Sequence, residues 1–235
     1  LAMQGVFEAT GALYRTELGE PGSAGPYVEL TQRAIASALS FLATGQPPDG
    51  ALRSAAARNE LTDKAVRVEH LRRLLDTPAA ALRMRDFAEQ WLGLTNMGRV
   101  QKNNEYFPRF NAELRDDLAQ STRVFLNAAF AGSRGRVEEL LTADYTYAND
   151  AVAAFLGSSE RPGAQMMRLS TAGLSRRGVL THPALLATYA HNDDGSPVLR
   201  GLLVRTRLLC ENIPAPPPTV VAAPAPVSAD STTRE

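Results

Sequence analysis

Residues 176–210 read RRGVLTHPALLATYAHNDDGSPVLRGLLVRTRLLC, and the rest of the chain is organised around this stretch. It holds two of the three histidines and the single cysteine. Pro183 suits the first position of a short helix. The pair Ser196-Pro197 is a capping residue followed by a first-position proline, which predicts a second helix to about Cys210. Residues 192–195, NDDG, have the composition of a turn.

Most of the chain before this stretch has the periodicity of amphipathic helices. Apolar residues recur at every third or fourth position in residues 1–18, 31–44, 62–75, 78–93 and 111–130. Thr31 and Asn111 are suited to cap two of these helices, and Pro78 suits the first position of a third. Residues 158–177 show no clear period, although a small hairpin is compatible with residues 166–169. The predicted fold class is all-α, an irregular bundle of about seven to ten helices with a Pro-rich C-terminal tail.

Changes in composition along the chain predict three parts. Residues 1–157 are expected to form a first helical module, residues 158–213 a second module docked on it, and residues 214–235 a Pro/Ala-rich linker or tail. The tail composition favours extended polyproline II structure. Leu1 is not an initiator methionine and opens directly into a helical pattern, so we expect the sequence to be a fragment.

Composition and motif absences argue against several classes of protein. The 25 Lys and Arg balance the 25 Asp and Glu, whereas nucleic-acid binding needs a basic surplus. The single cysteine excludes an intrachain disulfide. No apolar run approaches the roughly 20 residues that span a bilayer. The sequence contains no C-x-x-C-H haem motif, no H-E-x-x-H zinc motif and no Gly-rich phosphate loop.

Six residues of the focal stretch form a candidate polar site: Thr181, His182, His191, Asp193, Ser196 and Arg200. At a helix N-terminus, the His182 imidazole could act as ligand, base or donor, or could satisfy local groups. His191 beside Asp193 suits either a divalent ion or a solvated turn. Ser196 lacks a G-x-S-x-G elbow, so capping is favoured over nucleophilic attack. Arg200 could clamp an anion or pair with a nearby aspartate.

Three further patterns have two readings each. Residues 144–147 place a carboxylate beside two phenols, which suits acid–base work or, more simply, a hydrogen-bonded junction. Phe87 and Trp91 are spaced as core residues, with a stacking platform as the second reading. The pair Met166-Met167 could ligate a haem iron or fill gaps in a core.

Several blocks of the chain resemble a known family. GALYRTELG, SALSFLATGQPPDGALRSAA, FAEQWLGL and LLTADYTYAN resemble a module of secreted, cytochrome-like proteins of planctomycetes and myxobacteria. The stretch beginning RRGVLTHPALL resembles the module that follows it in the same proteins. The two are adjoining domains of unknown function, fifteen-ninety-two followed by fifteen-eighty-eight. The resemblance implies export to the periplasm or beyond, and a c-type haem motif downstream of the tail.

These observations favour a helical binding or scaffold module of an exported cytochrome-like protein, with no cofactor in the fragment itself. The alternative is part of an extracytoplasmic haem-dependent redox enzyme whose haem-attachment segment lies downstream, with His182, His191 or a methionine approaching that haem. A third reading is a metal-dependent hydrolase at His182, His191 and Asp193. Other domains of the same polypeptide are the expected partners, and neither nucleic acid nor a transmembrane segment is expected.

Overall fold

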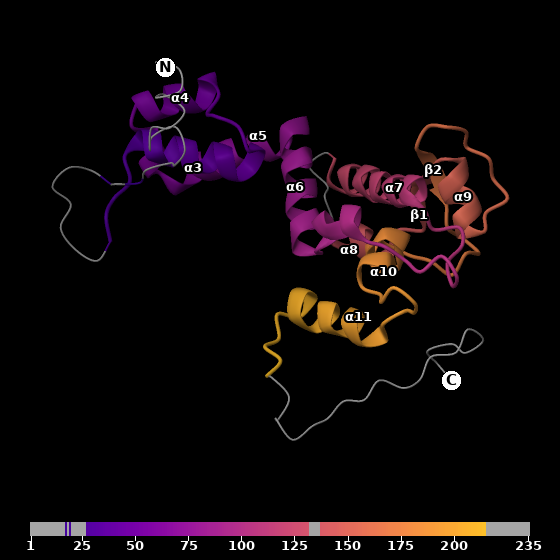
Figure 1. Ribbon diagram of the computed structural model, residues 1–235. Helices are drawn as coiled ribbons and strands as arrows, with labels where there is room; N and C mark the ends of the chain where they lie inside the picture. The colour runs from indigo at the N-terminus through magenta and orange to yellow at the C-terminus, as the bar shows by residue number, and fades with distance from the viewer. Residues whose placement is uncertain (1–16, 18, 20–26, 132–136, 215–235) are drawn as a thin grey trace, which may run out of the picture. The chain divides into compact units, whose positions relative to one another are not determined.

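The computed structural model describes residues 17, 19, 27–131 and 137–214 of the 235-residue chain. Contacts divide the chain into two compact units, Leu1–Arg83 and Met84–Glu235. The described residues are predominantly helical and contain one two-stranded sheet (Figure 1). This confirms the predicted irregular helical bundle. The helix predicted for residues 1–18 and the tail after residue 214 lie outside the described residues, and the division into modules 1–157 and 158–213 stays a prediction.

The first unit contains short helices that pack around small and branched apolar residues. Its elements are α3 (Gln32–Thr44), α4 (Gly50–Ala57), the 3-10 helix η1 (Glu60–Thr62) and α5 (Lys64–Leu75). As predicted, the Thr31 side chain caps α3 by accepting the N–H of Ala34. Gly45 ends the helix in the left-handed conformation. Leu52 and Leu61 are fully buried in the core of this unit.

The second unit holds the focal stretch and most of the helices. Its elements are α6 (Pro78–Trp91), which begins before the division at residue 83, η2 (Leu94–Arg99), α7 (Ala112–Phe130), α8 (Val137–Thr142), β1 (Tyr145–Ala148), α9 (Asp150–Leu156), β2 (Met167–Ser170), η3 (Val179–Thr181), α10 (Pro183–Thr188), α11 (Pro197–Leu203) and η4 (Val204–Leu208). Side chains of Asn111, Asn149 and Ser196 cap α7, α9 and α11, as the sequence predicts for Asn111 and Ser196.

The segment around residue 166 forms a strand, but its partner is distant in sequence. Strand β2 pairs antiparallel with β1, from Tyr145 opposite Ser170 to Ala148 opposite Met167. The small hairpin that the sequence allows at residues 166–169 does not form; residues 167–170 lie in one strand, which pairs with residues 145–148.

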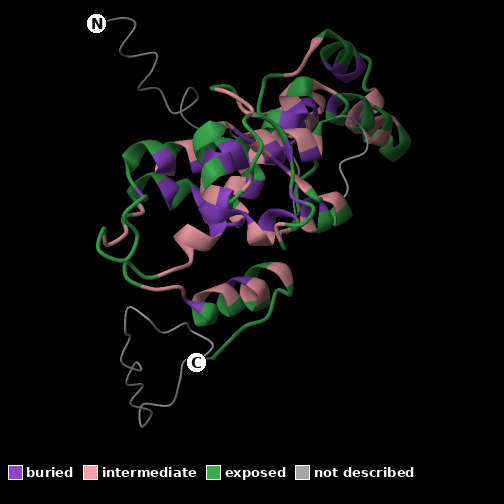
Figure 2. Cartoon of the chain, turned by 90° about the vertical axis from the view of Figure 1, so that its right-hand side faces the viewer, coloured by how far each residue is buried: buried purple, intermediate pink, exposed green. Residues whose placement is uncertain are grey.

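The last helix differs from its prediction at the C-terminal end. The helix predicted to about Cys210 is present to Leu208, but regular α-helix stops at Leu203 and the rest is the π-helix η4. The wider turn brings the Arg207 carbonyl to the indole N–H of Trp91, which donates to it at 3.0 Å. Figure 2 shows that α11, the lowest helix in that view, presents mainly exposed and half-buried residues.

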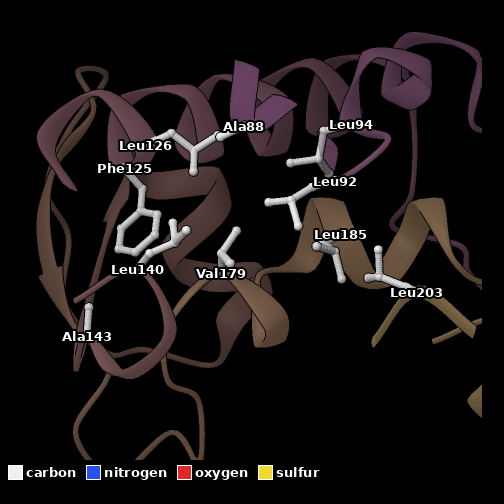
Figure 3. Packing of buried hydrophobic residues seen from close by; sticks show 10 residues of the cluster. All are labelled: Ala88, Leu92, Leu94, Phe125, Leu126, Leu140, Ala143, Val179, Leu185 and Leu203. Atoms are coloured by element: carbon white, nitrogen blue, oxygen red, sulfur yellow. The ribbon is translucent and has the colours of Figure 1, made fainter. Parts of the chain in front are cut away.

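Residues 176–210 are an integral part of the core of the second unit. Their buried apolar side chains Val179, Leu185 and Leu203 belong to one cluster with residues of α6, η2, α7 and α8 (Figure 3). The cluster comprises Ala88, Leu92, Leu94, Phe125, Leu126, Leu140, Ala143, Val179, Leu185 and Leu203. Burying side chains of this size is worth about 1.5–3 kcal/mol each, so the focal stretch contributes directly to the stability of the unit.

None of the helices within the described residues combines the length and the apolar character that a membrane crossing needs.

Candidate functional site

His182 lies inside the second unit, with only 4% of its surface exposed. It is the residue before Pro183, and its carbonyl accepts the first backbone bond of α10, from Leu186 at 3.0 Å. Its side chain makes no capping bond to α10. The ring instead contacts Thr122 on α7 and Thr146 on β1. The chain turn at Pro183 thus places an imidazole between a long helix and a strand.

Both ring nitrogens of His182 have a hydroxyl partner. Nδ1 lies 2.9 Å from Thr122 Oγ1, and Nε2 lies 2.7 Å from Thr146 Oγ1. Thr122 donates its only hydroxyl hydrogen to the Leu118 carbonyl at 3.0 Å, so this oxygen must accept from the ring. Nδ1 therefore carries the proton, and Nε2 accepts from Thr146. This network leaves the ring no free lone pair for a substrate or a metal.

The surroundings of His182 hold it in the neutral form. Burial, together with the positive charge of Arg176, lowers the pKa of His182 from 6.5 to about 4. The Phe125 ring packs against the imidazole with centroids 5.0 Å apart. A neutral ring whose two nitrogens are both bonded suits the interior of the fold better than proton transfer at neutral pH.

Three other residues of the predicted site serve nearby backbone groups. The Thr181 hydroxyl accepts the Arg177 N–H at 2.7 Å and donates to the Arg177 carbonyl at 2.8 Å. Ser196 is buried and caps α11 by accepting the Leu199 N–H at 3.2 Å. Arg200 donates its Nε–H to the Ser196 carbonyl at 3.3 Å. Ser196 is therefore a capping residue, the reading that the sequence favours.

His191 and Asp193 lie on an exposed turn, apart from the His182 network. Lys102 ties this turn to the loop before α7, because its Nζ donates to the carbonyls of Ala190 at 3.1 Å and His191 at 2.7 Å. Within the described residues, no group of three His, Cys, Asp or Glu side chains is placed to hold a metal ion. The structure thus does not bring together the three side chains that the hydrolase reading needs.

The tyrosine-rich segment forms a junction around Tyr145. Its hydroxyl donates to Glu139 Oε1 at 2.6 Å, and Arg168 lies 4.0 Å above its ring. Burial, with the hydrogen bond to Glu139, raises the pKa of Tyr145 to about 12. Asp144 is exposed, and its backbone carbonyl accepts from Thr171 at 2.7 Å. Tyr145 therefore stays protonated at neutral pH and links α8 to the sheet.

The expectation that Phe87 and Trp91 are core residues is wrong for Phe87. Phe87 is 53% exposed and stacks on Trp91, with centroids 6.2 Å apart and an interplanar angle of 9°. The pair is one helical turn apart on α6, which favours such contacts. Met166 is half-buried against an apolar cluster that includes Leu118, Val152 and Leu169. Met167 is 54% exposed on β2.

Sequence reasoning missed the two threonines that hold His182. Thr122 lies on the apolar face of α7 between Leu118 and Phe125, at helical spacing. Thr146 is a buried position of β1, whose burial alternates along the strand. A hydroxyl on an apolar face needs a partner, and this was the available signal.

Comparison with known proteins identifies two family models in the chain. Residues 30–157, more than half of the chain, match a family described as protein of unknown function (DUF1592), and residues 176–235 match one described as protein of unknown function (DUF1588). A search of curated proteins and a search of solved structures each found no match. Thr122 and Thr146 fall in the first match and His182 in the second. The chain therefore belongs to the DUF1592 family, and the DUF1588 family follows directly in the same polypeptide.

Proposed function

We propose that this chain is a non-catalytic helical binding or scaffold module of an exported cytochrome-like protein. The observation that supports this proposal is the state of His182, whose two ring nitrogens are occupied by Thr122 and Thr146. A general base needs a lone pair within reach of a substrate proton, and a nucleophile needs such a base beside it. Ser196 and Thr181 bond to local backbone. The side chains of His182, Ser196 and Thr181 are thus used by the fold.

The link to cytochromes comes from the families. The second family carries the name PSCyt3, and the resemblance of both modules is to exported proteins with c-type haem motifs. Covalent haem attachment needs a C-x-x-C-H motif, whereas this chain has one cysteine, Cys210, which is exposed. The residues of this chain therefore do not fit a covalently attached haem. Such a haem would belong to another part of the polypeptide, in the periplasm or outside the cell.

Packing supports a scaffold role. Leu185 and Leu203 from the second family segment share one core cluster with Phe125 and Leu126 from the first. A segment anchored in this way can carry a following domain without independent motion at its point of attachment. The module would then hold the haem-bearing part near its partners, while contributing no group to the haem.

A second candidate function is part of a haem-dependent redox enzyme, and one observation favours it. His191 is exposed, and within the described residues its imidazole makes no hydrogen bond. An exposed imidazole with an unbonded ring nitrogen is a suitable axial ligand for a haem supplied by a neighbouring domain. His182 is not suitable, because its acceptor nitrogen is bonded to Thr146.

The test is a titration of ferric haem into the purified chain at neutral pH, followed by absorption in the Soret region. The scaffold proposal predicts the spectrum of unbound haem. Histidine ligation would give a sharper, red-shifted band that disappears in His191→Ala. The matched control is His70→Ala, which removes a histidine from the first unit. A band that depends on His191 and persists in the control would overturn the scaffold proposal in favour of the redox enzyme.

A further inference from the structure

A small cavity lies against His182 in the second unit. Residues that line it include Thr146, Thr171, Arg176 and Thr181. The cavity has about 10 Å³ of interior space and is partly open to solvent. That space is close to the volume taken by one water-sized atom. The cavity can therefore admit one small ion or one oxygen of a larger group, and no more.

The charges around this cavity are of one sign. Arg176 and Arg177 line it, and no aspartate or glutamate does. Arg176 is half-buried and donates one N–H to the Thr181 carbonyl at 3.0 Å, which leaves most of its five donors unused. Within the described residues it makes no ion pair. Burial lowers the pKa of Arg176, because part of the guanidinium is removed from water.

A buried hydroxyl without a partner lines the same cavity. Thr171 is 5% exposed, and its Oγ1 has no hydrogen-bond partner among the described residues. Its backbone N–H donates to the Asp144 carbonyl at 2.7 Å, which fixes the residue at the end of the sheet. Buried hydroxyl groups are nearly always hydrogen-bonded, so an exception calls for a missing acceptor.

The wall of the cavity is rigid beside the two arginines. Gly178 has φ 55° and ψ −175°, a conformation essentially restricted to glycine. A Cβ at this position would overlap the carbonyl group of Leu141, and the Gly178 N–H donates to Ala143 at 2.8 Å. The backbone that carries Arg176 and Arg177 is therefore locked against the end of α8. Such a preorganised wall favours binding, because little order is lost when a ligand enters.

We propose that this cavity binds one small monovalent anion, with chloride or one carboxylate oxygen in its interior. The anion would supply both missing partners at once, a counter-charge for Arg176 and an acceptor for the Thr171 hydroxyl. A water molecule would satisfy the hydroxyl but leave the guanidinium unpaired. Sulfate, a bulkier tetrahedral dianion, is expected to bind less well than chloride or formate. This site is independent of the proposed scaffold role.

The test is ³⁵Cl NMR of chloride with the purified full chain, at constant ionic strength maintained with gluconate. Chloride in exchange with the cavity is expected to show excess line broadening that formate displaces and sulfate does not. Arg176→Gln should weaken chloride binding about tenfold or more, because a hydrogen bond to a charged group is lost. Arg99→Gln makes the same change of charge at an exposed position outside the cavity, and it should bind as the parent does.

Thr171→Val is a second test variant, which keeps the proposal testable if Arg176→Gln fails to fold. Because the hydroxyl has no partner in the protein, its removal should leave the melting temperature without anion unchanged or higher, yet abolish the broadening. Loss of the chloride broadening on addition of formate would show that a carboxylate competes for the same cavity. Equal broadening in the parent, Arg176→Gln and Thr171→Val proteins, or no binding of either anion, would refute the proposal and leave the cavity to water.

Discussion

Acid should destabilise the second unit through one residue, His182. Its pKa is about 4 in the folded protein and 6.5 when the ring is free in water. Between these values the unfolded chain binds a proton that the folded chain does not, so stability falls as the pH falls. The contribution of the neutral His182 ring to the unfolding free energy is complete above pH 6.5 and is lost progressively down to about pH 4.

The size of this effect follows from the shift itself. One pKa unit corresponds to about 1.4 kcal/mol, so the shift of His182 is worth about 3 kcal/mol across the window. Domains of this kind are stable by about 5–15 kcal/mol, and a loss of that size is readily measured. The origin of the cost is the transfer of a charged ring into a buried site, beside the like charge of Arg176.

The assay is urea unfolding at pH values from 7.5 to 4.5, observed through the fluorescence of Trp91. The chain has one tryptophan, and it lies in the second unit, so the signal reports that unit. His182→Gln keeps a donor and an acceptor but removes the titrating group. We expect it to be less stable than the parent by about 1–3 kcal/mol at pH 7.5, with a nearly flat dependence on pH. The difference in unfolding free energy between the parent and His182→Gln should therefore shrink as the pH is lowered.

Carboxylates titrate in the same range, but they do so equally in both proteins and cancel in the comparison. Asp49, whose pKa the bonded Arg73 lowers, lies in the first unit and does not affect the Trp91 signal directly. Parallel pH curves for the parent and His182→Gln would show that His182 is already charged or hydrated in the folded state. The neutral, closed ring on which the proposed function depends would then be wrong.

Three further outcomes are expected. In ¹⁵N NMR, His182 should show the Nδ1–H tautomer at pH 7 and keep it at pH 5, whereas a ring protonated at Nε2 would contradict the hydrogen-bond assignment. Thr146→Val should lower the unfolding free energy by about 1–3 kcal/mol in urea, because Nε2 loses its donor; an unchanged midpoint would mean that water reaches the ring. Gly178→Ala should lower the melting temperature far more than Gly173→Ala, because a Cβ at residue 178 meets the Leu141 carbonyl while residue 173, also at positive φ, has open space around it.

Helix starts could be predicted from the sequence because they depend on local chemistry. Thr31, Asn111 and Ser196 accept the N–H three residues ahead, and this geometry needs no knowledge of the rest of the fold. The end of the last helix could not be predicted in this way. Its π-turns accompany a hydrogen bond from the Trp91 indole to the carbonyl of Arg207, and these two residues are 116 positions apart in the sequence.

The environment of His182 also lay beyond the sequence for a physical reason. Its partners are 60 and 36 residues away, on a helix and a strand whose approach only tertiary packing decides. A histidine beside a proline is equally compatible with an exposed ligand and a buried structural ring. Helical periodicity predicts that Thr122 faces the core, but it does not predict which polar group meets it there.

The boundary between the two families is not a boundary between folding units. The family matches change between residues 157 and 176, whereas the compact units are divided after Arg83. His182, from the second match, is bonded to Thr122 and Thr146 from the first, and removal of either side would leave buried polar groups without partners. The shared apolar cluster would be cut by the same division. Since neither segment satisfies its own interior, the two segments depend on their packing against each other.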